Sequence, residues 1–136
     1  ARARLFVCSA LFGLVGAEDR IPAYRLSGGS KLPGVGNIRA AWQPSLGPVL
    51  SAMDGPIVDL RSGAYTALAP LPSAITVRVV TAEGKIVSHH NKSTKGRIAR
   101  ILACTPARTT SELVEVTRAA GLAATQTGPT TAEVVG

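Results

Sequence analysis

The side chains best suited to chemistry are basic ones that gather in the second half of this 136-residue chain. Between Arg78 and Arg108, seven basic residues accompany one acidic residue, Glu83, so this segment carries most of the formal net charge of +7. Such a surplus concentrates anions, including nucleic acid, phosphorylated ligands and acidic lipid. The densest group occupies one short run, and its candidate anion-binding residues are Asn91, Lys92, Lys95, Gly96, Arg97 and Arg100.

This run is predicted to lie on a helix from Asn91 to Cys104. One face of that helix is apolar and is expected to pack inward, with Ile98, Ile101 and Leu102. The opposite face carries, at intervals of four residues, Lys92, Gly96 and Arg100. The spacing therefore predicts a helix with a buried apolar face and an exposed basic face.

Gly96 is unusual inside a helix, where glycine costs about 1 kcal/mol relative to alanine. That cost indicates a close approach of another group to the backbone. A phosphate at the helix N-terminus, held by Lys92 and Lys95, accounts for both the glycine and the charge. A solvated basic face with an incidental glycine is the alternative, because charged helix faces are usually hydrated.

A second cluster follows a short apolar run, Ile57–Leu60, that is predicted to be a buried strand. Ligands collect at the carboxyl ends of strands in open α/β sheets. Arg61 offers a planar fork for phosphate or carboxylate, and Ser62 and Tyr65 are candidate partners on one helix face. The alternative pairs Asp59 with Arg61 structurally and packs Tyr65 in the core.

A third candidate is a loop in the first part of the chain. Tyr24 and Arg25 could stack on bases and grip a nucleic-acid backbone, with Lys31 as a further contact. A surface cover without a ligand is an equal alternative for this loop.

Several other chemistries find no support in the sequence. No P-loop, dinucleotide-binding fingerprint or serine-centred nucleophile elbow is present. His89 and His90 are adjacent, so in a strand they face opposite sides and cannot chelate one metal together. Cys8 and Cys104 are expected to be small buried hydrophobes in a reduced, cytoplasmic setting. We therefore expect no catalytic residue, metal or cofactor, and a binding protein rather than an enzyme.

The predicted strands and helices that position these residues indicate a single α/β domain over residues 1–136, with a mixed sheet and flanking helices. Predicted strands cover Arg4–Leu11 (buried and parallel), Ile57–Leu60, Ile75–Thr81 with a hairpin partner Lys85–Ser88, and an edge strand Ala132–Val135. Predicted helical segments cover Asn37–Met53, Ser62–Leu68, Asn91–Cys104 and Thr109–Gly121, the last capped by Thr110 or Ser111. An irregular stretch is expected from Gly13 to Gly36.

Several short motifs occur in an order that resembles the C-terminal part of the peroxide stress protein YaaA family. They are Ser9-Ala-Leu-Phe-Gly13, Pro22-x-Tyr-Arg-Leu26, Lys31-Leu-Pro-Gly34, Trp42, Asp59-Leu-x-Ser-x-x-Tyr65 and Asn91-Lys-x-Thr-Lys-Gly96. The resemblance covers nearly all of the chain up to about Arg108. The opening segment of the family, with its Pro-Ser-Glu and Lys motif, has no counterpart here, so the N-terminal part of the family fold is expected to be missing.

The resemblance implies a cytosolic bacterial protein that limits iron-dependent oxidative damage and binds DNA in a positively charged cleft. It also implies an α/β fold with a helix-hairpin-helix-like element. The motif positions that match the family and could line the cleft are Ser62, Tyr65, Lys92, Lys95, Gly96 and Arg100. Sequence-nonspecific DNA is thus the expected partner, with no membrane association. The alternatives are an enzyme acting on a nucleotide or other phosphorylated small molecule, with Ser62 or Tyr65 as its reactive hydroxyl, and an inactive gene fragment.

Overall fold

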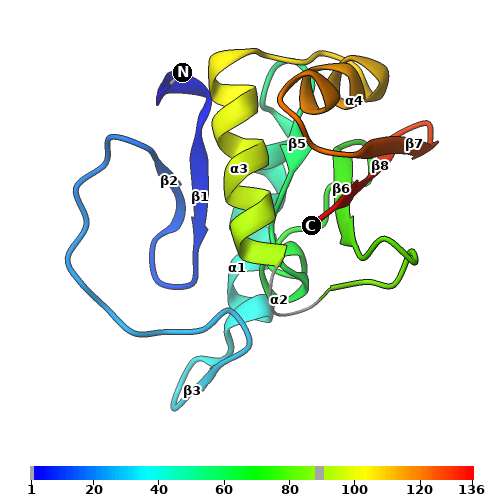
Figure 1. The fold of residues 1–136 in the computed structure, drawn as a ribbon. Helices are drawn as coiled ribbons and strands as arrows, with labels where there is room; N and C mark the ends of the chain where they lie inside the picture. The colour runs from blue at the N-terminus through cyan, green and yellow to red at the C-terminus, as the bar shows by residue number, and fades with distance from the viewer. Residues whose placement is uncertain (1, 88–90) are drawn as a thin grey trace. The chain divides into compact units, whose positions relative to one another are not determined.

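The computed structural model describes residues 2–87 and 91–136 (Figure 1). The contacts divide the chain into two compact units. Unit 1 contains the residues up to Asp54 together with Arg61–Pro72, and unit 2 contains Gly55–Leu60 together with Ser73–Gly136.

Unit 2 is built on a four-stranded mixed sheet, which confirms the predicted α/β class. Its strands are β5 (Val58–Asp59), β6 (Ile75–Val80), β7 (Ala124–Gly128) and β8 (Thr131–Val135). They are arranged in the order β5-β6-β8-β7. The β5, β6 and β8 strands run parallel, and β7 pairs antiparallel with β8. The predicted buried strand at Ile57–Leu60 and the predicted strand at Ile75–Thr81 are both confirmed.

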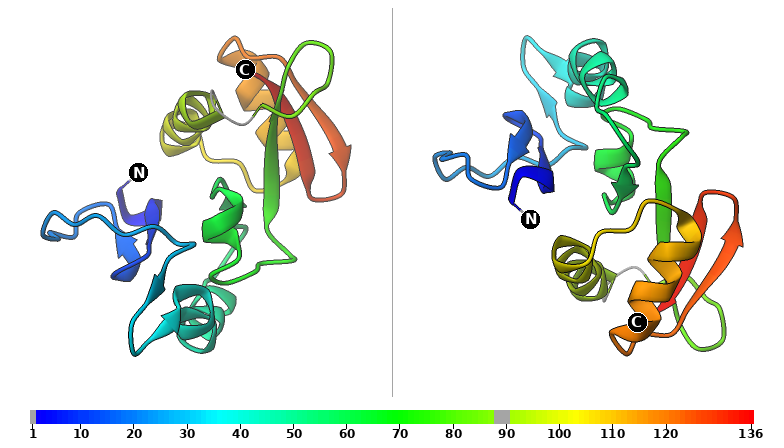
Figure 2. Two further views of the ribbon diagram at one scale, coloured as in Figure 1. Left: turned by 90° about the horizontal axis from the view of Figure 1, so that it is seen from below. Right: turned by 90° about the horizontal axis from the view of Figure 1, so that it is seen from above.

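Helices α3 (Asn91–Cys104) and α4 (Thr110–Ala119) cover one face of this sheet, as Figure 2 shows. Burial alternates along β6, where Ile75, Val77 and Val79 are buried while Thr76 and Arg78 are exposed. Such alternation is typical of a sheet with one face in the core. The core beneath the two helices contains Ile75, Val77, Ile98, Leu113, Val114, Leu122, Ala124, Ala132 and Val134.

The last predicted strand was placed wrongly within the sheet. We expected Ala132–Val135 at an edge, but β8 lies between β6 and β7 and its Ala132 and Val134 are fully buried. The antiparallel strand β7 was not predicted, because its residues Ala124–Gly128 are mostly polar and lack an apolar run. The segment predicted as a hairpin partner, Lys85–Ser88, does fold back on β6, since Val87 N donates to Val79 O at 3.1 Å. Ser88 itself lies outside the described residues.

Unit 1 begins with a short 3-10 helix (Arg2–Arg4) and an antiparallel hairpin of β1 (Phe6–Ser9) and β2 (Gly13–Gly16). The prediction of a buried parallel strand at Arg4–Leu11 was therefore wrong. The Ser9 hydroxyl accepts hydrogen bonds from the backbone N–H groups of Leu11 and Phe12, and Gly13 adopts a φ of 76°. These features turn the chain, and they leave Phe6 46% and Val7 62% exposed.

The stretch that was expected to be irregular, Gly13–Gly36, contains β2 and a small hairpin as well as loop. That hairpin pairs β3 (Lys31–Leu32) with β4 (Gly36–Asn37) and leads directly into helix α1 (Ile38–Ser51). Asn37 caps α1, accepting a hydrogen bond from Arg39 N at 2.9 Å. The helix continues through Pro44 and Pro48.

The short helix α2 (Gly63–Thr66) confirms the helical turns predicted over Ser62–Leu68. It belongs to unit 1, where α1 and the residues after α2 supply most of a second core. The buried residues of this core are Ala10, Ile38, Leu46, Leu50, Leu68 and Ala69. Trp42 and Tyr65 pack against it.

Two local predictions in unit 2 need correction. Helix α4 is capped by Thr109, whose hydroxyl accepts from Glu112 N at 3.1 Å, and not by Thr110 or Ser111. Thr110 Oγ1 instead donates to Pro129 O at 2.7 Å, so its side chain is used in packing. Cys104, the last residue of α3, is exposed and not buried as expected, whereas Cys8 is half-buried.

Candidate nucleic-acid interface

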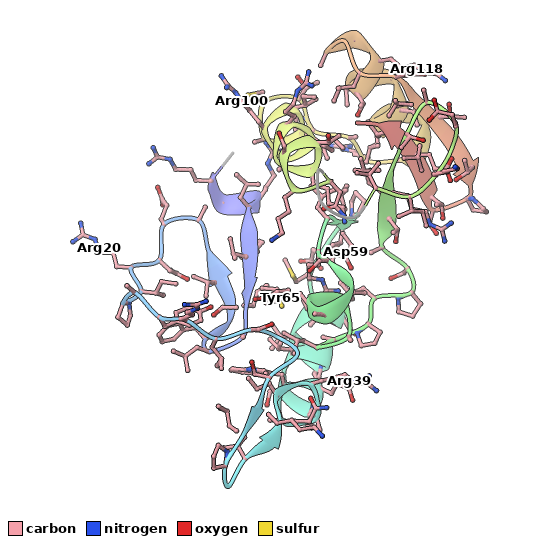
Figure 3. The ribbon with its side chains drawn as sticks, turned by 60° about the horizontal axis from the view of Figure 1, so that its bottom comes forward. Arg20, Arg39, Asp59, Tyr65, Arg100 and Arg118 are labelled. Carbon is pink, nitrogen blue, oxygen red and sulfur yellow. The ribbon has the colours of Figure 1, made fainter. Side chains whose placement is uncertain are left out.

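Helix α3 presents a basic surface that is free of acidic side chains. Lys92, Gly96, Arg97 and Arg100 are exposed, and we call these four residues the basic stripe. The Arg100 side chain points away from the helix (Figure 3). On the inward side Thr94 and Ile98 are buried, which confirms the predicted division into an apolar face and a basic face. Packing of the inner face against the sheet therefore fixes which way the basic stripe points.

Gly96 lies in open space. A Cβ added at this position would meet nothing within 4 Å, so packing within the described chain does not require a glycine. The predicted close approach of another group to the Gly96 backbone is therefore not made by the described residues of the chain. The backbone between Lys92 and Arg100 remains accessible to a ligand from outside.

Lys95 differs from the basic stripe. It is half-buried, and burial lowers the pKa of its amine while the nearby negative charge of Asp59 acts in the opposite direction. Asp59 is itself buried, with 9% of its surface exposed, and it ends strand β5 (Figure 3). Within unit 2, the end of strand β5 thus influences a residue of α3 that is distant in sequence. Asn91, one turn before Lys95, is also half-buried.

The remaining residues of the second cluster belong to unit 1, where Arg61 and Tyr65 have structural roles. Arg61 donates from Nη1 to Tyr65 O at 3.3 Å and from Nη2 to Ala69 O at 2.9 Å. Tyr65 packs against the core of unit 1, as the structural alternative proposed. Ser62 is exposed and occupies the cap position of α2. The guanidinium therefore holds the end of α2, a role that requires no ligand.

The loop candidates are likewise tied to unit 1. The Tyr24 hydroxyl forms a hydrogen bond with Ser9 Oγ, and its ring meets Phe12 edge-on with centroids 5.6 Å apart. These contacts fasten the loop to the turn of the first hairpin, as expected of a surface cover. Arg25 and Lys31 are exposed.

Sequence reasoning missed one hollow in unit 1. It has a volume of about 280 Å³ and is lined mainly by apolar side chains from the turn after β1, the second hairpin and α1. Its lining includes Leu11, Leu26, Leu32, Val35, Ile38 and Trp42. Scattered apolar residues in loops gave no periodic signal from which this hollow could be predicted.

The structure also bears on metals and membranes. Among residues 2–87 and 91–136, no three His, Cys, Asp or Glu side chains gather closely enough to hold a metal ion. His89 and His90 lie outside the described residues. No helix in that part of the chain has the length and apolar content needed to cross a bilayer.

Comparison with known proteins identifies the family. The chain matches the family described as peroxide stress protein YaaA over residues 1–127. It is 46% identical to a UPF0246 protein of Corynebacterium efficiens, with 88% of this chain and 53% of that protein covered. A UPF0246 protein of Streptomyces coelicolor is 43% identical, with 86% and 49% covered. The chain thus spans about half the length of the curated relatives that it matches.

The mixed sheet and the exposed basic stripe define an α/β protein with a basic helix on its surface. The chain belongs to the peroxide stress protein YaaA family, as its motifs predicted.

Proposed function

We propose that this chain is part of a cytoplasmic DNA-binding protein of the peroxide stress response, which helps to limit iron-dependent oxidative damage. The observation that carries the proposal is the basic stripe, which exposes Lys92, Arg97 and Arg100 on a helix without an acidic residue. Phosphate contacts by Lys and Arg dominate the affinity of proteins for DNA and carry no base-sequence information. Binding is therefore expected to be sequence-nonspecific.

Gly96 supports the same proposal. The open space above it allows a phosphate to approach the helix backbone between Lys92 and Arg100. Helices α3 and α4 are joined by residues 105–109 and pack against one another, and we assign the helix-hairpin-helix-like element of the family to this pair. In this arrangement α3 supplies the contacts to DNA, and α4 anchors α3 to the sheet.

The test is fluorescence anisotropy of the chain with a labelled DNA duplex across a series of salt concentrations. Log affinity is expected to fall with log salt by about 0.9 for each phosphate contact. The Lys92→Ala/Arg97→Ala/Arg100→Ala variant should bind far more weakly and show a shallower slope. A matched control, Arg20→Ala/Arg39→Ala/Lys85→Ala, removes the same charge from exposed positions elsewhere and should keep most of the affinity.

Equal losses in the two triple variants would contradict a specific role for the basic stripe and would indicate nonspecific charge attraction. Protection is tested separately, by exposing supercoiled plasmid to ferrous iron and hydrogen peroxide with each variant. The unsubstituted chain should reduce strand nicking, and the basic-stripe variant should not. Equal nicking with both would argue against a protective function of DNA binding.

A further inference from the structure

The basic stripe occupies a limited arc of helix α3. At about 100° per residue, the arc from Lys92 to Arg97 covers about 140° of the helix circumference. Ala99 and Ile101 lie just beyond its two edges, and both are half-buried. On the opposite side Ile98 is fully buried. The helix is therefore covered up to both edges of the basic stripe, and a ligand can reach it from the outward side only.

The cations of the basic stripe are spread along the helix axis. Lys92 and Arg100 are eight residues apart, which corresponds to about 12 Å at the rise of an α-helix. Arg97 lies between them along the axis, and a Cβ added at Gly96 would meet nothing within 4 Å. Phosphates of one DNA strand follow one another about every 3.4 Å along the DNA axis, so about three of them fit a stretch of this length. The spacing of the stripe thus matches a short run of phosphates on one strand.

The rest of the exposed surface of α3 has no side chain suited to reading bases. Its other exposed side chains are those of Ser93 and Cys104, which are short and carry neither an aromatic ring for stacking nor an amide for pairing with adenine. A helix that enters the major groove fills it, since both are about 12 Å wide, and its two flanks then face the backbones of both strands. On α3 those flanks carry the half-buried Ala99 and Ile101. Both observations favour contact with one backbone over insertion into a groove.

We propose that α3 lies along the backbone of one nucleic-acid strand, with its three exposed cations on about three neighbouring phosphates. These cations are Lys92, Arg97 and Arg100, and the strand passes over the open space at Gly96. The inference rests on the proposed function and narrows its ligand to a single backbone, whether or not that strand is paired. Duplex and single-stranded DNA are therefore expected to bind alike.

The experiment compares short probes of one sequence by fluorescence anisotropy with the unsubstituted chain. The probes are the native duplex, the single strand, a duplex with neutral methylphosphonate linkages in one strand, and a duplex with these linkages in both strands. The first three should bind within about fivefold of one another, and the fully neutral duplex should not bind. Three phosphate contacts predict a fall of log affinity with log salt of about 2.7 for the native duplex and about 2.1 for the single strand.

Single substitutions test the assignment of the contacts. Lys92→Ala and Arg100→Ala should each lower the salt slope with the single strand by about 0.7, because each removes one phosphate contact. Arg39→Ala removes an exposed charge from α1 and should leave the slope unchanged. Unchanged slopes in both stripe variants would overturn the placement of the strand on α3. Circular dichroism checks the fold of each variant, and the comparison of probes requires no variant.

The outcomes separate this inference from the proposed function. Native duplex that binds at least about tenfold more tightly than the single strand and the half-neutral duplex would indicate contacts to both strands. That result would overturn the inference and leave DNA binding intact. Failure of every probe to bind would refute the proposed function and this inference with it. Binding of the fully neutral duplex would show that phosphates are not the contacts and would contradict both.

Discussion

The indole Nε1 of Trp42 donates a 2.7 Å hydrogen bond to the carbonyl oxygen of Ala10. This bond connects the middle of α1 to the turn between β1 and β2. The same indole lies against Gly13, where an added Cβ would come within 2.9 Å of the Trp42 ring. The first hairpin of unit 1 is thus held on α1 by one polar contact and one close approach of backbone to ring.

Gly13→Ala is expected to destabilise the chain strongly. The added methyl group would meet the Trp42 ring, and the φ of 76° is unfavourable for alanine. Gly34→Ala is the matched control, since Gly34 has the same φ but an added Cβ meets nothing within 4 Å. The positive φ costs alanine about 1 kcal/mol in both variants. Overpacking against the Trp42 ring adds about 1–3 kcal/mol only at Gly13. Urea unfolding measures the free energy of unfolding of both variants. Equal losses of stability would contradict the role of Trp42.

Thr117→Val is expected to stabilise the chain by about 1 kcal/mol, because an unpaired buried hydroxyl costs free energy that a methyl group does not. Thr117 is fully buried in α4, and among the described residues its Oγ1 has no hydrogen-bond partner. Thr110→Val on the same helix should cost about 1 kcal/mol instead, since it loses the bond to Pro129 O. Thermal unfolding that shifts both variants in the same direction would contradict this reasoning.

The amine of Lys95 should titrate below its ordinary pKa of 10.5. The unfolded chain then binds more protons between the lowered pKa and 10.5, so the free energy of unfolding should rise with pH across that window. Asp59→Asn should lower the pKa further, because the Asp59 charge now favours the protonated amine. NMR titration of the Lys95 Cε resonance measures the pKa. A Lys95→Met variant that keeps the same rise in stability with pH would assign the rise to another group.

Gly96→Ala is expected to separate stability from binding. Alanine in this exposed helix position should raise stability by about 0.5–1 kcal/mol. Its methyl group should also hinder a phosphate at the backbone and weaken duplex binding about fivefold, which corresponds to about 1 kcal/mol. Gly47→Ala in α1, where an added Cβ also meets nothing within 4 Å, should leave binding unchanged. Unchanged anisotropy with Gly96→Ala would show that no ligand group approaches Gly96.

Strong periodic patterns allowed much of the fold to be predicted from the sequence. The apolar spacing around Ile98 predicted both the extent of α3 and its inward face, and the β-branched run after Ile75 predicted β6. The prediction at Arg4–Leu11 failed because an apolar run does not distinguish a central strand from an exposed hairpin. The decisive feature was local, namely the Ser9 hydroxyl bonding to the N–H groups of the following turn.

The candidate site shows a similar limit. Charge spacing placed Lys92 and Arg100 on one exposed face, but it treated Lys95 as one more phosphate contact. The difference is burial in the fold, which lowers the pKa of the Lys95 amine, while Asp59, far away in sequence, acts in the opposite direction. Arg61 likewise resembled an anion ligand, although its partners are the carbonyl oxygens of Tyr65 and Ala69.

The division into two compact units has a consequence for how such a protein can arise and be dissected. The chain passes from one unit to the other after Asp54, again after Leu60 and again after Pro72. Strand β5 therefore belongs to a unit whose other strands are encoded after a segment of the first unit. Neither unit corresponds to one uninterrupted stretch of gene, so recombination at a single boundary cannot transfer either of them whole. The two units are expected to be inherited together.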